Sequence, residues 1–140
     1  MLLLTTISTE AQNLDRDQFM RQRIEQAKLR QIRKNLQLDD ATFSQFRQLY
    51  LRYERTLANV DFRSQNRIVN VNADSLTDRQ ADELLMAQWL RAKQLINVRE
   101  RFYGEFRRIL TAQQLVKLYQ SETEIRQKVM SELGKRRRQL

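Results

Sequence analysis

The near-absence of helix-breaking residues is the strongest constraint on how this chain can fold. Across 140 residues there is no proline, and Gly104 and Gly134 are the only glycines. A β-rich domain draws on glycine and proline for its turns, so their scarcity, with abundant Gln, Arg, Leu and Glu, favours long helices and few loops. Hydrophobic residues make up 41% of the chain. We therefore expect a single all-α domain, elongated or hairpin-like, that shares part of its apolar surface with a partner.

Four helical segments are predicted from the spacing of the apolar residues. The first covers residues 15–36, and the second begins just after residue 40 and ends at about residue 62. The third and fourth cover residues 78–109 and 112–133. Between the second and the third, a polar loop rich in Asn and Ser covers residues 64–75. The second segment has the most regular seam, in which aromatic side chains recur at alternating spacings of three and four residues. The side chains expected in the core or in a dimer seam are Phe43, Phe46, Tyr50, Tyr53, Leu57, Trp89, Leu95, Phe102 and Phe106.

One short pattern, Leu-Thr-x-x-Gln, occurs at residues 76–80 and again at 110–114. In a capping box, the Thr side chain accepts a hydrogen bond from a free N–H of the first helical turn, and the Gln side chain accepts one from the N–H of the Thr. The preceding Leu acts as a hydrophobic staple. Each copy is therefore predicted to begin a helix, and Asp39 caps a weaker third version. The residues of the two full copies are Leu76, Thr77, Gln80, Leu110, Thr111 and Gln114.

The two ends of the chain differ from the rest in composition. Residues 1–14 begin with an apolar run followed by small polar residues, which fits either a frayed tail or the remnant of a secretory signal. At the other end, Gly134 is placed to terminate the last helix, which leaves residues 134–140 as a basic, mobile tail. The predicted domain therefore spans residues 15–133.

The charge and the missing residue types restrict the possible functions. Lys and Arg number 26 and Asp and Glu 17, giving a net charge of +9 that attracts nucleic acid, acidic lipid, lipopolysaccharide or acidic protein segments alike. The lack of His and Cys removes the usual general base, thiol chemistry and the commonest metal ligand. There is also no Gly-rich phosphate loop and no apolar run of transmembrane length. The sequence therefore predicts no enzyme, cofactor, metal site or small-molecule substrate.

Two copies of Leu-Thr-x-x-Gln in a small, basic, helical chain resemble the Spy/CpxP family of periplasmic proteins, which is known for this motif. The stretch Arg101–Glu122 is especially similar to a Bacteroidetes-type branch of that family, as are Phe19–Ile24 and Asn35–Asp40. The resemblance runs from about residue 17 to 133. It implies four helices in an elongated bent hairpin, a cradle-shaped antiparallel homodimer and periplasmic residence. It also implies ATP-independent chaperone activity or envelope-stress sensing, without the metal function of relatives that use His.

Three functions follow as expectations. In the first, the protein holds unfolded or acidic client segments on a basic, partly apolar concave surface, because Arg pairs with carboxylates and lies on aromatic rings. In the second, the same surface docks on a membrane-bound signalling protein as a sensor or inhibitor subunit. The third, nucleic-acid binding, is less favoured because the basic residues spread over all four segments. For each arginine considered for client binding, the alternative is that it lies on a helix face that contacts only solvent. The candidate client-binding residues are Arg21, Arg23, Arg30, Arg33, Arg47, Arg52 and Arg55.

Overall fold

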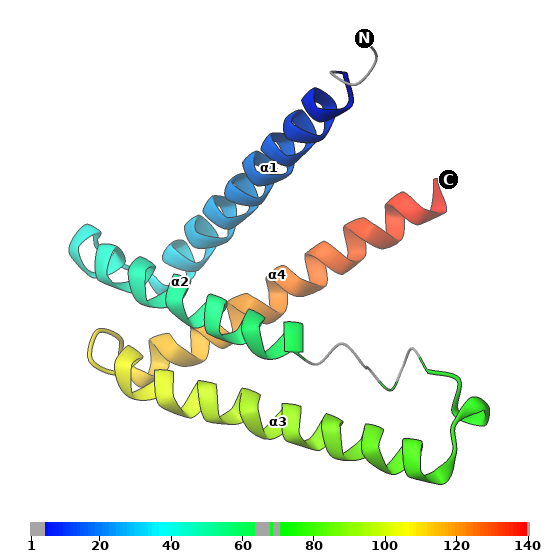
Figure 1. The fold of residues 1–140 in the computed structure, drawn as a ribbon. Coiled ribbons are helices and arrows are strands. Elements are labelled where there is room, and N and C mark those ends of the chain that lie inside the picture. Colours follow the sequence, from blue (N-terminus) through cyan, green and yellow to red (C-terminus); the bar gives the residue numbers. More distant parts are fainter. Residues whose placement is uncertain (1–4, 64–67, 69–70, 140) are drawn as a thin grey trace. The chain divides into compact units, whose positions relative to one another are not determined.

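Helices account for nearly all of the part of the chain that the computed structural model describes, residues 5–63, 68 and 71–139 (Figure 1). No strand occurs in these residues, so the predicted all-α class is confirmed. Nor does any helix among them have both the length and the apolarity needed to cross a membrane. The elements are α1 (Thr5–Leu36), α2 (Asp40–Arg63), the short 3₁₀ helix η2 (Ala73–Ser75), α3 (Asp78–Phe106) and α4 (Ala112–Arg138).

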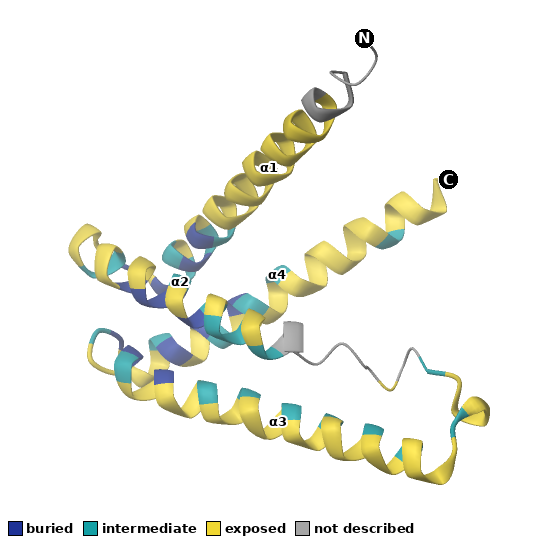
Figure 2. Ribbon diagram, viewed as in Figure 1, coloured by how far each residue is buried: buried dark blue, intermediate teal, exposed yellow. Residues whose placement is uncertain are grey.

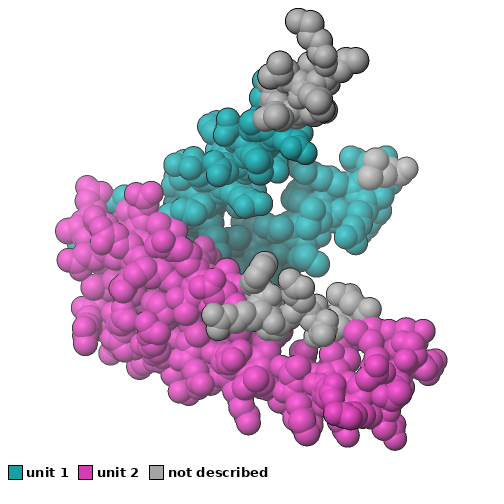
Figure 3. Space-filling view, viewed as in Figure 1, with its two compact units in different colours: residues 1–39, 113–140 teal, residues 40–112 magenta. Residues whose placement is uncertain are grey.

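The helices form two units, α1 with α4 and α2 with α3 (Figure 3). The first unit consists of residues 1–39 and 113–140, and the second of residues 40–112. Within each unit the two helices run in opposite directions (Figure 1). The first unit holds fourteen Lys and Arg against eight Asp and Glu, so it carries +6 of the net charge of +9.

Aromatic rings hold α2 against α3. Tyr53 lies edge-on to Phe102 and Phe106, with centroid distances of 5.4 and 5.5 Å. Phe46 lies 5.3 Å from Tyr50 and 6.0 Å from Phe106. All five side chains are buried, and such ring pairs contribute about 0.5–1.5 kcal/mol each beyond the burial of their surface. The order of the contacts, Phe46 with Phe106 and Tyr53 with Phe102, is that of an antiparallel pair.

The other residues expected in the core or in a dimer seam lie outside this cluster. Phe43, Leu57 and Leu95 are half-buried, whereas Trp89 is 59% exposed. The half-buried positions of α3, such as Gln88 and Leu95, mark the side of this helix that is covered. Trp89 lies more than about 90° around the helix from that side, which explains its exposure.

Side-chain hydrogen bonds and aliphatic burial join the end of α1 to the start of α4. Asn35 Nδ2 donates to Ser121 Oγ at 2.8 Å, and the Ser121 hydroxyl donates to the Lys117 carbonyl oxygen at 2.7 Å. Gln114 Nε2 donates to the carbonyl oxygen of Leu36 at 3.2 Å. These bonds satisfy polar groups beside the apolar contact and fix the register of the pair. The buried apolar side chains of this unit are Leu29, Ile32, Leu36, Leu38, Leu115 and Leu118.

The burial of α1 stops where its packing side turns polar. Beyond the buried positions, Glu25 and Gln22 continue the same side of the helix toward the N-terminus. They offer no apolar contact to Val129 and Leu133, which continue the packing side of α4 and are each 48% exposed. All of residues 9–27 are exposed, as Figure 2 shows for the outer part of α1.

The Leu-Thr pair of each copy of Leu-Thr-x-x-Gln directly precedes a helix. At the first, the Gln80 N–H donates to Thr77 Oγ1 at 3.2 Å and the Thr77 N–H donates to Gln80 Oε1 at 3.0 Å, which is the capping box that the sequence predicts. At the second, α4 begins at Ala112, directly after Thr111. The Gln114 amide of that copy binds α1, as described above, so the second copy also helps to join two helices.

The end of α3 comes at Phe106, three residues before the predicted end at Ile109. The chain then turns: the Leu110 N–H donates to the Phe106 carbonyl oxygen at 2.8 Å, and Arg107 Nη1 donates to the Leu110 carbonyl oxygen at 2.9 Å. Leu110 is buried, and Leu76, its counterpart in the first copy of the motif, is half-buried. These hydrogen bonds separate α3 from α4 without a Gly or Pro.

Helix extends further at both termini than the sequence suggests. Within the predicted tail 1–14, whose first four residues lie outside the described part, the chain is helical from Thr5 onward. At the other end, α4 continues through Gly134 to Arg138, so the prediction that Gly134 ends the helix is wrong. A Gly costs about 1 kcal/mol in a helix interior. The four cations 135–138 offset part of this cost because they lie at the negative end of the helix dipole.

A left-handed residue closes α1. Gln37 has a φ of 54°, the Leu38 N–H donates to the Arg33 carbonyl oxygen at 3.2 Å, and the Gln37 N–H donates to that of Lys34 at 3.2 Å. This is the Schellman arrangement, in which Gly is the usual left-handed residue because it lacks Cβ. The helix therefore ends where the sequence predicts, without the Gly that would signal it.

Candidate functional site

The side of α1 that points away from its buried residues is rich in cations. At 3.6 residues per turn, this side carries Arg16, Arg23 and Arg30, spaced by seven residues, and Lys34 close to the same line. All four side chains are exposed. Their positive charge is therefore accessible to a partner.

Apolar side chains are interleaved with these cations. Phe19, Met20 and Ile24 are all more than half exposed, and Ala27 is exposed on the same side. The guanidinium of Arg23 lies 5.7 Å from the centroid of the Phe19 ring, a cation–π contact worth about 0.5–1 kcal/mol at an exposed site. An apolar group and a cation are thus presented together on one surface.

The carboxylates of α1 lie elsewhere on the helix. Glu10, Asp15, Asp17 and Glu25 all fall outside an arc of about 140° that contains the cations and the apolar side chains. This segregation leaves the arc with a local excess of positive charge. We call the arc the cationic face of α1; it comprises Arg16, Phe19, Met20, Arg23, Ile24, Ala27, Arg30 and Lys34.

The arginines predicted to bind clients do not form one surface on α1. Arg23 and Arg30 lie on the cationic face, but Arg21 points to another side of the helix. Arg33 Nε donates to the Leu38 carbonyl oxygen at 3.3 Å, so this side chain serves the end of α1. Only two of these four predicted residues therefore share a face.

The other predicted arginines belong to α2, in the second unit. Arg47 is exposed. Arg52 Nη2 lies 2.9 Å from Glu105 Oε2 and joins α2 to α3, and Arg55 Nε donates to the Leu51 carbonyl oxygen at 3.3 Å. An exposed ion pair of this kind contributes about 0–1 kcal/mol. Arg52 and Arg55 are thus engaged within their own unit.

Sequence reasoning missed Arg16 and Lys34. The recurrence of Arg at positions 16, 23 and 30 is visible in the sequence as a seven-residue period. Its meaning depends on which side of the helix is buried, and the apolar pattern of this segment is too irregular to decide that alone.

A second uncovered surface lies along α3. Six positions recur at spacings of four and three residues, the period of a coiled-coil seam, and they fall within an arc of about 80°. Its largest apolar side chains, Leu85, Trp89, Ile96 and Tyr103, are 40–59% exposed. This α3 stripe comprises Leu85, Trp89, Ala92, Ile96, Arg99 and Tyr103.

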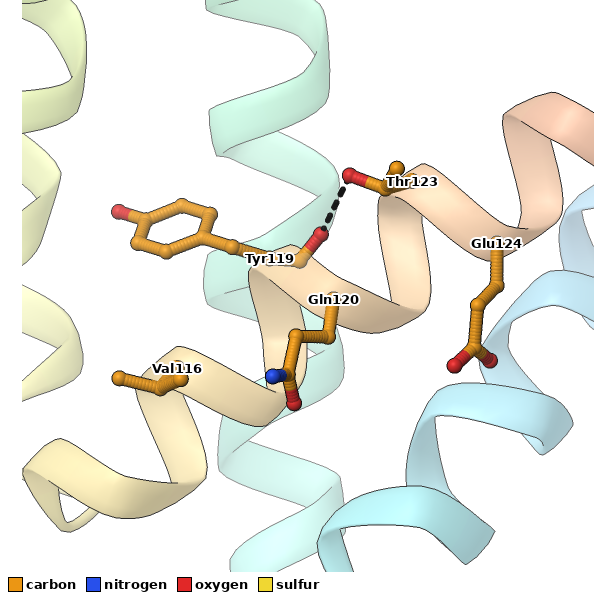
Figure 4. Close-up of a pocket in the computed structure, with 5 residues that line it drawn as sticks. All are labelled: Val116, Tyr119, Gln120, Thr123 and Glu124. Atoms are coloured by element: carbon orange, nitrogen blue, oxygen red, sulfur yellow. Dashed lines mark hydrogen bonds between the residues drawn. The ribbon is translucent and has the colours of Figure 1, made fainter.

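Two hollows in the surface of the described residues have linings with few charged groups. One, of about 570 Å³, is lined by Val116, Tyr119, Gln120, Thr123 and Glu124 of α4 (Figure 4). Its Thr123 hydroxyl donates to the Tyr119 carbonyl oxygen at 3.1 Å, a bond within the helix. Another, of about 330 Å³, is lined by Val71, Leu76, Gln80, Glu83, Leu84 and Ala87. Each has a single carboxylate, and neither has a Lys or Arg in its lining.

The described residues also contain no group of three or more His, Cys, Asp or Glu that could hold a metal ion. The helix faces described above present exposed cations and apolar side chains together. Such surfaces suit extended or flat partners better than small molecules.

No protein-family model, curated protein or solved structure matches this chain. The resemblance to the Spy/CpxP family rests on the motif and the stretches quoted above.

Proposed function

We propose that this protein is an ATP-independent chaperone or envelope-stress protein of the periplasm, which binds unfolded or acidic protein segments as a homodimer. The observation that carries the proposal is the cationic face of α1. It combines cations, exposed apolar side chains and the exclusion of carboxylates over about 140° of a helix.

The chemistry of this face suits an unfolded chain. Arg pairs with carboxylates and also lies on aromatic rings, so it accepts segments of varied sequence. Each exposed contact is weak, about 0–1 kcal/mol, and several together give capture without permanent binding. Long-range attraction by the net charge of +6 on this unit brings acidic segments to the surface before the short-range contacts form.

The α3 stripe supports the homodimer. Two copies of α3 can pair in opposite directions about Gln94, with Ala92 of each copy opposite Ile96 of the other and Leu85 opposite Tyr103. In the same register Arg99 of one copy meets Trp89 of the other, a cation–π pair. Pairing would cover the exposed side chains of this stripe, which belongs to the second unit, whereas the cationic face of α1 belongs to the first.

The test of client binding is suppression of aggregation of an unfolding acidic protein without ATP. The variant Arg23→Gln/Arg30→Gln removes two cations from the cationic face. We expect it to need about five- to thirtyfold more protein for half-maximal suppression, because each contact contributes up to about 1 kcal/mol. Raised salt is expected to weaken suppression by the unmodified protein.

The matched control is Arg21→Gln/Lys117→Gln, which removes the same charge from exposed positions of the same unit, away from the cationic face. We expect the control to suppress aggregation like the unmodified protein. Equal losses in the two variants, or no suppression by the unmodified protein, would contradict the proposal. Fractionation of the native cells tests the proposed periplasmic location. Recovery of the protein in another compartment would overturn that location.

A further inference from the structure

The last turns of α4 carry an unusual concentration of positive charge. Residues 126–138 contain six cations and a single acid, Glu132, whose Oε1 lies 3.6 Å from Lys135 Nζ. Because α4 continues through Gly134, these cations are displayed on a helix. We call this segment the basic end of α4; its cations are Arg126, Lys128, Lys135, Arg136, Arg137 and Arg138.

Exposed apolar side chains lie among these cations. Val129 and Leu133 are 48% exposed and Met130 is 65% exposed. They are uncovered because the packing side of α1 is polar at Glu25 and Gln22, as described above. The basic end of α4 therefore presents both positive charge and apolar surface to solvent.

The two kinds of side chain share one side of the helix. At 3.6 residues per turn, the three apolar side chains fall within an arc of about 120° that also contains Arg126, Arg136 and Arg137. Glu132 lies outside that arc, as do Lys128 and Lys135. The result is a side on which cations are interleaved with apolar side chains and which has no carboxylate.

We propose that this side of α4 binds the surface of a bilayer rich in anionic lipid. Apolar side chains of an interfacial helix enter the boundary between headgroups and acyl chains, while Arg and Lys contact the phosphates. Clusters of four to eight Lys and Arg on an amphipathic helix are attracted to such surfaces, and the attraction falls off within a Debye length. The helix lies on the membrane surface and does not cross it.

Charge complementarity fits both a bilayer and duplex nucleic acid, and the exposed apolar side chains distinguish between them. Both partners are polyanions, but a duplex backbone offers no apolar region that would cover Val129, Met130 and Leu133. A bilayer surface offers both phosphate and apolar depth. The placement of the apolar side chains on the same side as Arg136 and Arg137 therefore favours the bilayer.

This binding goes beyond the proposed client binding, because it uses α4 and not the cationic face of α1. Vesicle binding by the basic end of α4 and aggregation suppression by the cationic face can each fail while the other holds. The Arg23→Gln/Arg30→Gln variant is accordingly expected to bind vesicles with little change.

The test is co-sedimentation of the full chain with vesicles of phosphatidylcholine, with or without phosphatidylglycerol. We expect binding only to vesicles that contain phosphatidylglycerol. Arg136→Gln/Arg137→Gln is expected to weaken this binding about tenfold or more, since each cation adds to the surface attraction. Lys128→Gln/Lys135→Gln removes the same charge from outside this side of α4 and is expected to weaken binding distinctly less.

A third variant, Met130→Ser/Leu133→Ser, keeps the charge and removes apolar surface; we expect it to weaken binding to these vesicles about tenfold or more. Circular dichroism checks that each variant keeps its helicity. Equal binding by all variants, unchanged binding by the serine variant, or tighter binding to duplex DNA than to the vesicles would overturn the proposal. Loss of vesicle binding in inorganic phosphate, beyond that in chloride of equal ionic strength, would assign the site to free phosphate and also overturn it.

Discussion

The α2–α3 pair buries five aromatic side chains along its contact, whereas the α1–α4 pair buries aliphatic side chains near adjoining ends and leaves residues 9–27 of α1 exposed. Both are antiparallel helix pairs of similar length. They differ in whether the apolar positions of the two helices continue to face each other. Tyr50 and Tyr53 of α2 continue the seam begun at Phe46, but Glu25 and Gln22 of α1 interrupt theirs.

The comparison shows how a small helical protein can separate stability from binding. Burial of matched apolar side chains supplies most of the stability of a helix in a protein. A helix segment without such burial contributes little to stability, but its side chains remain available to partners. In this chain two such segments, the cationic face of α1 and the basic end of α4, have a large excess of cations: four cations and no acid on the first, six cations and one acid on the second.

The strongest test of this contrast removes one aromatic ring from the α2–α3 core. Phe106→Ala should lower the free energy of unfolding by about 3–5 kcal/mol, because Phe106 is buried among aromatic rings and the neighbours can collapse only partly. Phe19→Ala, on the exposed part of α1, should change it by less than about 0.5 kcal/mol. Urea unfolding followed by circular dichroism measures both, and similar losses would break the contrast.

A second test compares two leucines of the same helix. Leu118→Ala should cost about 2–4 kcal/mol, since Leu118 is completely buried. Leu133→Ala should cost less than about 1 kcal/mol, because nearly half of this side chain is already exposed. The thermal midpoints of the two variants provide the readout. A large fall in the thermal midpoint of Leu133→Ala would mean that the C-terminal part of α4 is packed against other residues in solution.

The capping box at the start of α3 predicts a smaller effect. Thr77→Ala removes the acceptor of the Gln80 N–H and should cost about 1 kcal/mol. Thr77→Ser keeps a hydroxyl and should recover most of that loss. Hydrogen exchange of the first turn of α3 gives the local readout. If alanine and serine behave alike, the box contributes nothing to where this helix begins.

The smallest expected effect is a gain in stability at the end of α1. Gln37 occupies a left-handed conformation, which costs a residue with Cβ about 1–2 kcal/mol. Gln37→Gly removes that cost, but the greater conformational freedom of Gly in the unfolded chain opposes folding by about 0.5–1 kcal/mol. We expect a net gain of about 0.5 kcal/mol in the free energy of unfolding. Gln37→Val is the counter-variant, and it should destabilise the protein.

Much of the fold could be predicted from the sequence because its strongest signals are local. The scarcity of Gly and Pro gave the helical class, the spacing of Phe46, Tyr50 and Tyr53 gave the seam of α2, and Thr77 with Gln80 gave the start of α3. In each case the neighbouring residues decide the structure by themselves. The end of α4 was misplaced because Gly134 is only mildly unfavourable in a helix, and the cations after it were not weighed against it.

The candidate sites could be predicted only in part. Arg23 and Arg30 were among the predicted client-binding residues, but Arg16 and Lys34 join them only once the buried side of α1 is known. In α3, Trp89 and Phe102 look alike as large aromatic residues of one helix. They differ in burial because Phe102 contacts Tyr53 of α2, a residue far from it in the chain.

The central claim is that the uncovered face of α1 is the part that binds clients, and hydrogen exchange tests it most directly. The exchange of each helix would be measured with and without a reduced, carboxymethylated acidic protein that stays unfolded. We expect residues 13–27 of α1 to exchange fast in the free protein and to slow on addition of the client, while the aromatic region of α2 and α3 stays equally slow in both. Unchanged exchange in α1, with new protection elsewhere in the chain, would contradict the claim.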